Sequence, residues 1–183
     1  MALHSPDRRY PSGRDQWDLD LRFSIVPVQI AVIGAGDAPA SVEVVAEEVG
    51  AALAQRGAVV VCGGQMGVMG AACRGAKSAG GTTVGILPGS DPSAANPWVD
   101  IVIPTGLGEA RNALVVRSAA SVIAVGGGYG TLSEVAIALR LGTPVIGIDT
   151  WTLVRPDGKV DTGIVVMESP LEAAQAAVTL AAG

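Results

Sequence analysis

The side chains best suited to chemistry lie in and around a short glycine-rich stretch, GGGYGTLSE at residues 126–134. It follows an apolar run and precedes a segment with helical spacing. Glycines let a ligand approach the backbone closely, and free N–H groups at the start of a helix attract anions. A hydroxyl at Thr131 could then face a bound phosphate, with the carboxylate of Glu134 one turn further on and near the sugar. The stretch predicts a phosphate site formed by Gly127, Gly128, Gly130 and Thr131.

The same stretch has a purely structural interpretation. Thr131 and Glu134 match the capping box [ST]-x-x-E, in which the two side chains cap the first turn of a helix. This pattern accounts for both residues without any ligand. Because the spacing is the same for a cap and for a phosphate loop with a neighbouring carboxylate, both interpretations stay open.

Two further glycine clusters follow apolar runs. One is CGGQMGVMG at 62–70, with candidate ligand-binding residues Gly63, Gly64 and Gly67; the other is IGAGDAP at 33–39, with candidate Gly34. The second cluster begins like a dinucleotide-binding GxGxxG, but a proline takes the third glycine position and the later acidic residue is absent, which argues against an NAD site. None of the glycine loops carries the GK[ST] of a P-loop, so ATP hydrolysis of that type is not expected.

An arginine is predicted near the start of a helix, in GEARNALVVRSA at 108–119. A cation there faces the positive end of the helix dipole, which is mildly unfavourable. Solvent or a pair with Glu109 could compensate Arg111, and so could a bound anion. We favour the anion, with Asn112 as a neighbouring ligand-binding residue.

Composition excludes several classes of function. The only histidine is His4, so a histidine-dependent triad is not expected, and neither is a metal site. A net charge of −5 and 3% aromatic residues argue against nucleic-acid binding. Glycine, proline or charge interrupts every apolar run, so we expect no membrane segment. The first residues lack the apolar core of a signal peptide, which predicts a cytoplasmic protein.

Short β-branched runs alternate with alanine-rich helical segments along the chain, which predicts a parallel sheet covered by helices. The fold class is therefore α/β, a doubly wound Rossmann-like parallel sheet of six or seven strands with helices on both faces. Residues 1–26 are predicted to be a mobile extension and residues 27–183 a single domain. A proline-rich loop is expected at 88–99 and a hairpin at 150–163. Strands are expected at 28–33, 58–62, 82–87, 100–103, 121–125 and 144–148, and helices at 39–55, 67–79, 107–119, 130–141 and 170–182.

Taken together, GGQMGVMG, RN and GGGYGTLSE resemble a Rossmann-type family once labelled lysine decarboxylases. It includes the Lonely Guy phosphoribohydrolases and the molybdenum cofactor carrier proteins, and the resemblance covers about residues 28–149. It implies that the Gly-Thr loop holds a 5′-phosphate, with Arg111 and Glu134 as catalytic residues flanking the ribose. Asn112 replaces the lysine of the phosphoribohydrolase motif and Gly126 replaces its proline, which places the chain closer to the carriers.

Two functions follow from this resemblance. The first is hydrolysis of a nucleoside 5′-monophosphate to base and ribose 5-phosphate, with no cofactor required. The alternative is a carrier that binds a molybdopterin-like or other phosphorylated ligand without turnover. The expected partner is in either case a small phosphorylated ligand, AMP-like or pterin-like. The apolar character of 130–141 and the family both predict a homodimer or homotetramer.

Overall fold

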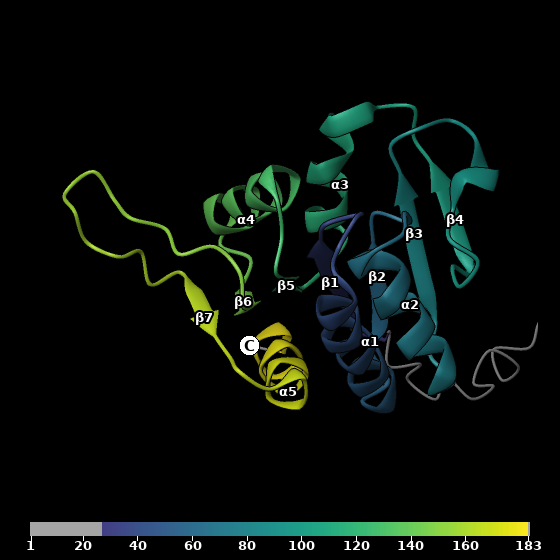
Figure 1. Ribbon diagram of the computed structural model, residues 1–183, viewed down its shortest axis with the longest axis horizontal. Coiled ribbons are helices and arrows are strands. Elements are labelled where there is room, and N and C mark those ends of the chain that lie inside the picture. Colours follow the sequence, from purple (N-terminus) through teal and green to yellow (C-terminus); the bar gives the residue numbers. More distant parts are fainter. Residues whose placement is uncertain (1–26, 183) are drawn as a thin grey trace, which may run out of the picture.

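The computed structural model describes residues 27–182, and the segment predicted to be a mobile extension lies outside them. Strands and helices alternate along most of the chain (Figure 1). Two short 3₁₀ helices, Pro92–Ala94 and Gly108–Arg111, interrupt the connections around the fourth strand. The strands are β1 (Gln29–Gly34), β2 (Val59–Cys62), β3 (Thr83–Leu87), β4 (Ile101–Pro104), β5 (Ser121–Val125), β6 (Val145–Ile148) and β7 (Ile164–Val166), and the helices are α1 (Ala40–Gln55), α2 (Val68–Ser78), α3 (Asn112–Arg117), α4 (Tyr129–Leu141) and α5 (Pro170–Ala181).

All seven strands form one parallel sheet in the order β4-β3-β2-β1-β5-β6-β7. The chain first moves outward from β1 to β4 and then returns to place β5 on the other side of β1. In the register, Ile30 of β1 pairs with Ser121 of β5 and Gly34 pairs with Val125. The order therefore reverses between β1 and β5, and ligands of such sheets bind beyond the strand ends at that point.

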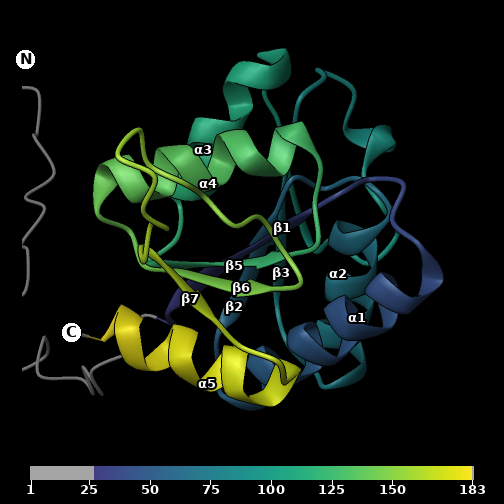
Figure 2. The same cartoon turned by 60° about the vertical axis from the view of Figure 1, so that its left-hand side comes forward.

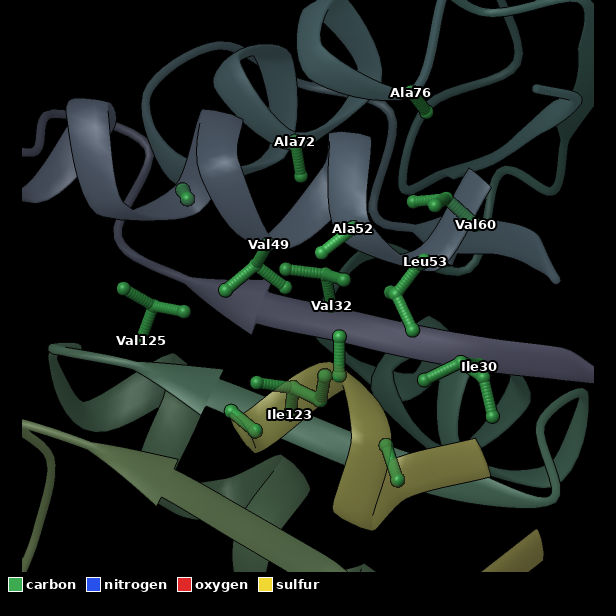
Figure 3. Close-up of a cluster of buried hydrophobic side chains, with 14 of the residues drawn as sticks. Ile30, Val32, Val49, Ala52, Leu53, Val60, Ala72, Ala76, Ile123 and Val125 are labelled. Atoms are coloured by element: carbon green, nitrogen blue, oxygen red, sulfur yellow. The ribbon is translucent and has the colours of Figure 1, made fainter. Parts of the chain in front are cut away.

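Helices cover both faces of the sheet, which confirms the predicted fold class. Figure 2 shows α3 and α4 on one face and α1, α2 and α5 on the other. Val49 and Leu53 of α1 pack toward Val32 and Ile30 of β1 (Figure 3), and all four are fully buried. Strands buried on both faces need apolar side chains at successive positions, which explains the β-branched runs.

The six predicted strands are all present, within one or two residues of their expected ends. The seventh strand, Ile164–Val166, has only three residues; the predicted fold class allowed for seven strands, but the position of this one was not predicted. The predicted hairpin is a small one: Val154 bridges Val160, and the Gly158 N–H donates to the Arg155 carbonyl at 2.9 Å. The helix expected at 107–119 is shorter, because its first turn is the 3₁₀ helix that ends at Arg111.

Self-association stays a prediction, and the exposed faces of α3 and α4 indicate where it would occur. Apolar side chains are exposed at Leu114 of α3 and Leu141 of α4, and also at Leu107, which precedes the 3₁₀ helix. Burying such side chains against a second copy would remove them from water, which favours association. We expect light scattering to give at least a dimer at micromolar concentration, and a stable monomer at that concentration would contradict the prediction.

Within residues 27–182 no helix is both long and apolar enough to cross a bilayer.

Candidate functional site

A cleft of about 250 Å³ lies at the reversal point of the sheet. The loop after β1, the 3₁₀ helix before α3 and the start of α4 contribute its walls. These elements place Arg111, Asn112, Thr131 and Glu134 around one space, as the sequence predicted for a shared site. The complete lining is Gly34, Ala35, Gly36, Asp37, Gln65, Met69, Glu109, Arg111, Asn112, Gly128, Gly130, Thr131 and Glu134.

The start of α4 differs from the predicted capping box. The helix begins at Tyr129, so Thr131 is its third residue and Glu134 its sixth, and no side chain caps it. Positive φ angles at Gly126 and Gly127 (56° and 119°) turn the chain into the helix earlier than the pattern suggests. The capping-box interpretation is therefore wrong. Because the first amides of a helix lack intrahelical partners, this uncapped start offers free N–H donors at the cleft.

The glycines of this loop have different structural tasks. A Cβ at Gly127 would lie 2.5–2.7 Å from the side chain of Thr131, so this glycine makes room for a buried threonine. Cβ atoms at Gly128 and Gly130 would meet no protein atom within 4 Å, and both residues line the cleft. The fold therefore requires the first glycine, whereas the other two leave space open in front of the helix start.

The glycines of the other two clusters lie mostly behind the cleft. Gly34 lines it, but a Cβ there would lie 2.5 Å from a side-chain carbon of Val68 on α2. Gly64 and Gly67 have positive φ angles of 74° and 63° and pack against neighbouring backbone or side chains. Gly63 leaves room for the Arg111 guanidinium, whose Nη1 occupies the space that a Cβ would take. Binding roles for these four glycines stay predictions, and close packing accounts for their presence.

Arg111 is the only cation of the cleft lining. Its side chain is 6% exposed, and its Nε is buried without a hydrogen-bond partner. No ion pair joins it to a carboxylate of residues 27–182, so the pairing with Glu109 weighed above is not formed. A buried donor without a partner is costly. A bound anion in the cleft would offset that cost.

Glu134 lies in the same cleft and is 7% exposed. Burial raises the pKa of its carboxyl from 4.5 to about 7, against the lowering effect of Arg111 and with a further raising effect of Glu109. The group is therefore divided between its protonated and ionised forms near neutral pH. A carboxyl with such a pKa can donate or accept a proton at physiological pH.

Polar contacts that the sequence did not predict hold the helix start in place. Asn112 Nδ2 donates to Ser133 Oγ at 2.9 Å, which links α3 to α4. On the other side, Thr150 Oγ1 donates to the Gly126 carbonyl at 2.6 Å and Trp151 Nε1 to that of Gly128 at 3.2 Å. These two residues follow β6, and only the sheet order, which places β6 beside β5, brings them to the loop.

A second chamber of about 460 Å³ adjoins the cleft. Gly36, Asp37 and Gln65 line both, while Met66 and Ala94 line the second chamber alone. Sequence reasoning missed this chamber because it attached no role to Asp37 or to the segment after β3. A larger groove of about 630 Å³ follows α5; five of its nine lining residues are apolar, and none belongs to the glycine loops.

This arrangement of loops can be compared with known proteins. Residues 27–174 match the model of the SLOG cluster4 family. The chain belongs to the SLOG cluster4 family. Among solved structures, it is similar to the molybdenum cofactor binding protein of Rippkaea orientalis, with 35% identity and a TM-score of 0.75. The match covers 85% of this chain and 98% of that protein.

Two further relatives represent the two functions considered above. The molybdenum cofactor carrier protein of Chlamydomonas reinhardtii is 37% identical, with a TM-score of 0.75, over 86% of this chain and 99% of that one. A cytokinin riboside 5′-monophosphate phosphoribohydrolase of Mycobacterium tuberculosis is 34% identical over 116 residues, which are 58% of this chain and 62% of that protein. The family resemblance inferred from the motifs is confirmed, and the match to the carriers is the more extensive.

Proposed function

We propose that this protein is a carrier that binds a small phosphorylated, molybdopterin-like ligand in the cleft at the reversal point of the sheet. The observation that carries the proposal is Arg111, a buried guanidinium with an unpartnered Nε that lines the same cleft as the uncapped start of α4. Guanidinium groups and helix N-termini both favour phosphate. The phosphate would lie between Arg111 and the first amides of α4, with Asn112 holding the two helices together through Ser133.

The similarity to carriers supports binding without turnover. It extends over almost the whole length of both carrier structures, whereas the hydrolase match spans less than two thirds of that enzyme. Asn112 and Gly126 also depart from the phosphoribohydrolase motif in the direction of the carriers.

Mass spectrometry of the purified protein tests the proposal. We expect a phosphorylated heterocycle to co-purify, or an added one to bind with one molecule per chain. A protein that arrives empty and binds neither a phosphorylated pterin nor a nucleoside 5′-monophosphate in calorimetry would contradict it.

A second function, N-glycosidic hydrolysis, is favoured by one observation, the neutral-range pKa of Glu134 beside Arg111. In this reaction the bond between C1′ and the base nitrogen breaks, water adds its hydroxyl to C1′, and its proton is transferred to the departing base. The ionised Glu134 would stabilise the positive charge that develops at C1′ or accept the proton of the attacking water. Incubating the protein with AMP or GMP and measuring the released free base by chromatography decides between hydrolysis and binding without turnover.

A further inference from the structure

The cleft and the second chamber together form one elongated space with different chemistry at its two ends. Gly36, Asp37 and Gln65 lie at the junction, because they line both parts. The first part holds Arg111 and the free amides of α4, which suit an anion. Five residues line the second part, and none of them is a cation. A ligand with one phosphate would therefore lie with its phosphate in the first part and its remaining portion toward the second.

The second chamber combines apolar and hydrogen-bond-accepting groups. Met66, which is 53% exposed, and Ala94 offer apolar contacts for the face of a flat ring. Asp37 contributes a carboxylate and Gln65 an amide. An ionised carboxylate only accepts hydrogen bonds, and its two oxygens can accept two parallel donors.

The backbone just before Asp37 is held against the second glycine loop. The Val68 N–H donates to the Ala35 carbonyl at 3.0 Å. Gly67 packs so closely on the same segment that a Cβ there would lie 2.6 Å from the backbone of Gly36. The two residues before Asp37 are therefore fixed before a ligand arrives, and Asp37 follows them as an exposed turn residue. A preformed loop reduces the entropy cost of binding.

We infer that Asp37 selects the heterocycle of the ligand, and that this heterocycle carries a ring N–H beside an exocyclic amino group. The 2-amino-4-oxo edge of guanine and of pterins presents two such parallel donors. Adenine presents an amino group beside a ring nitrogen that accepts, and that nitrogen would repel a carboxylate. This inference rests on the proposed function and adds the residue that selects the ring of the ligand.

Calorimetry with GMP, IMP and AMP on the full chain tests the inference. A charge-assisted hydrogen bond contributes about 1.5–3 kcal/mol, so we expect GMP to bind roughly 10- to 100-fold more tightly than AMP. IMP, which has the ring N–H but no amino group, should fall between them. In Asp37→Asn the amide offers one donor and one acceptor, so the preference for GMP over AMP should shrink to about threefold or less.

Glu109→Gln is the matched control, because Glu109 lines the first part of the space but not the second chamber. Both substitutions remove one negative charge near the phosphate. Glu109→Gln should therefore strengthen binding of all three nucleotides to a similar extent, whereas Asp37→Asn should also remove the charge-assisted hydrogen bonds to GMP. Only Asp37→Asn should change the ratio between GMP and AMP. An equal change of that ratio in Glu109→Gln would overturn the role of Asp37.

A phosphorylated pterin, such as dihydroneopterin monophosphate, separates the two sources of the same ring edge. Tighter binding of the pterin than of GMP identifies a pterin ligand, and the reverse order identifies a guanine nucleotide. The GMP-to-AMP ratio, measured separately, tests the selection by Asp37. Equal binding of GMP and AMP overturns this inference while leaving the proposed function intact. If no phosphorylated compound binds, the proposed function fails, and the inference fails with it.

Discussion

Replacing Gly128 with valine is expected to abolish binding of phosphorylated ligands while the protein remains folded. The residue lines the cleft at the N-cap of α4, and a Cβ there meets no protein atom within 4 Å. Its φ and ψ of −102° and −160° are open to any residue, so the valine causes no backbone strain. The added methyl groups would occupy the space in front of the free amides. Because these charge-assisted hydrogen bonds would be lost, we expect affinity for GMP to fall by at least about 100-fold in calorimetry.

Gly89→Val is the matched control for this substitution. Gly89 has no positive φ, and the nearest atom to a Cβ there is the Asp91 nitrogen at 4.0 Å, but the residue does not line the cleft. Both variants should keep the circular dichroism spectrum and cooperative melting of the wild type. Unchanged affinity in a folded Gly128→Val protein would contradict the prediction that the phosphate binds at the start of α4.

Glu134→Gln is expected to change both turnover and the pH dependence of stability. If the wild type hydrolyses AMP or GMP, loss of the carboxylate should lower turnover by about 10²–10⁴-fold. The rate of the wild type should rise with pH through about 7, because the ionised form is the active one. Equal turnover in the variant would show that Glu134 takes no part in the reaction. If the wild type has no turnover, hydrolysis is excluded and the carrier function is the one that remains.

The effect of Glu134 on stability has a definite sign. Its pKa is about 7 in the folded protein and near 4.5 when unfolded, so the folded state binds the proton more tightly. Stability then falls as pH rises from 4.5 to 7 and is constant above that range, a loss of about 3 kcal/mol. Glutamine stays neutral, so Glu134→Gln should melt several degrees higher than the wild type at pH 8 and at nearly the same temperature at pH 4.5. A lower melting temperature of the variant at pH 8 would contradict the burial of an ionised carboxylate there.

Much of the fold could be predicted because the strands are buried on both faces. The β-branched runs of β1 and β5 have no polar alternation, and this pattern alone indicates a parallel sheet between helix layers. The edge strand β7 escaped prediction because three residues with two exposed valines carry no such pattern. The first turn of the helix predicted at 107–119 also differed, since a 3₁₀ turn there has the same composition as an α-helical one.

The residues of the site were easier to predict than their local conformation. Arg111, Asn112, Thr131 and Glu134 were found by motif, and the structure brings all of them to one cleft. The capping box was wrong because glycines with positive φ start the helix earlier than the sequence pattern places it. The second chamber around Asp37 depends on three segments, after β1, β2 and β3, that are distant in sequence and meet only through the strand order.

A crystal structure of the full chain with GMP tests the central claim most directly. We predict that the phosphate oxygens lie within hydrogen-bond distance of the amides at Tyr129, Gly130 and Thr131 and of the Arg111 guanidinium. A phosphate located in the chamber beside Asp37, or a nucleotide bound in the groove along α5, would contradict the account.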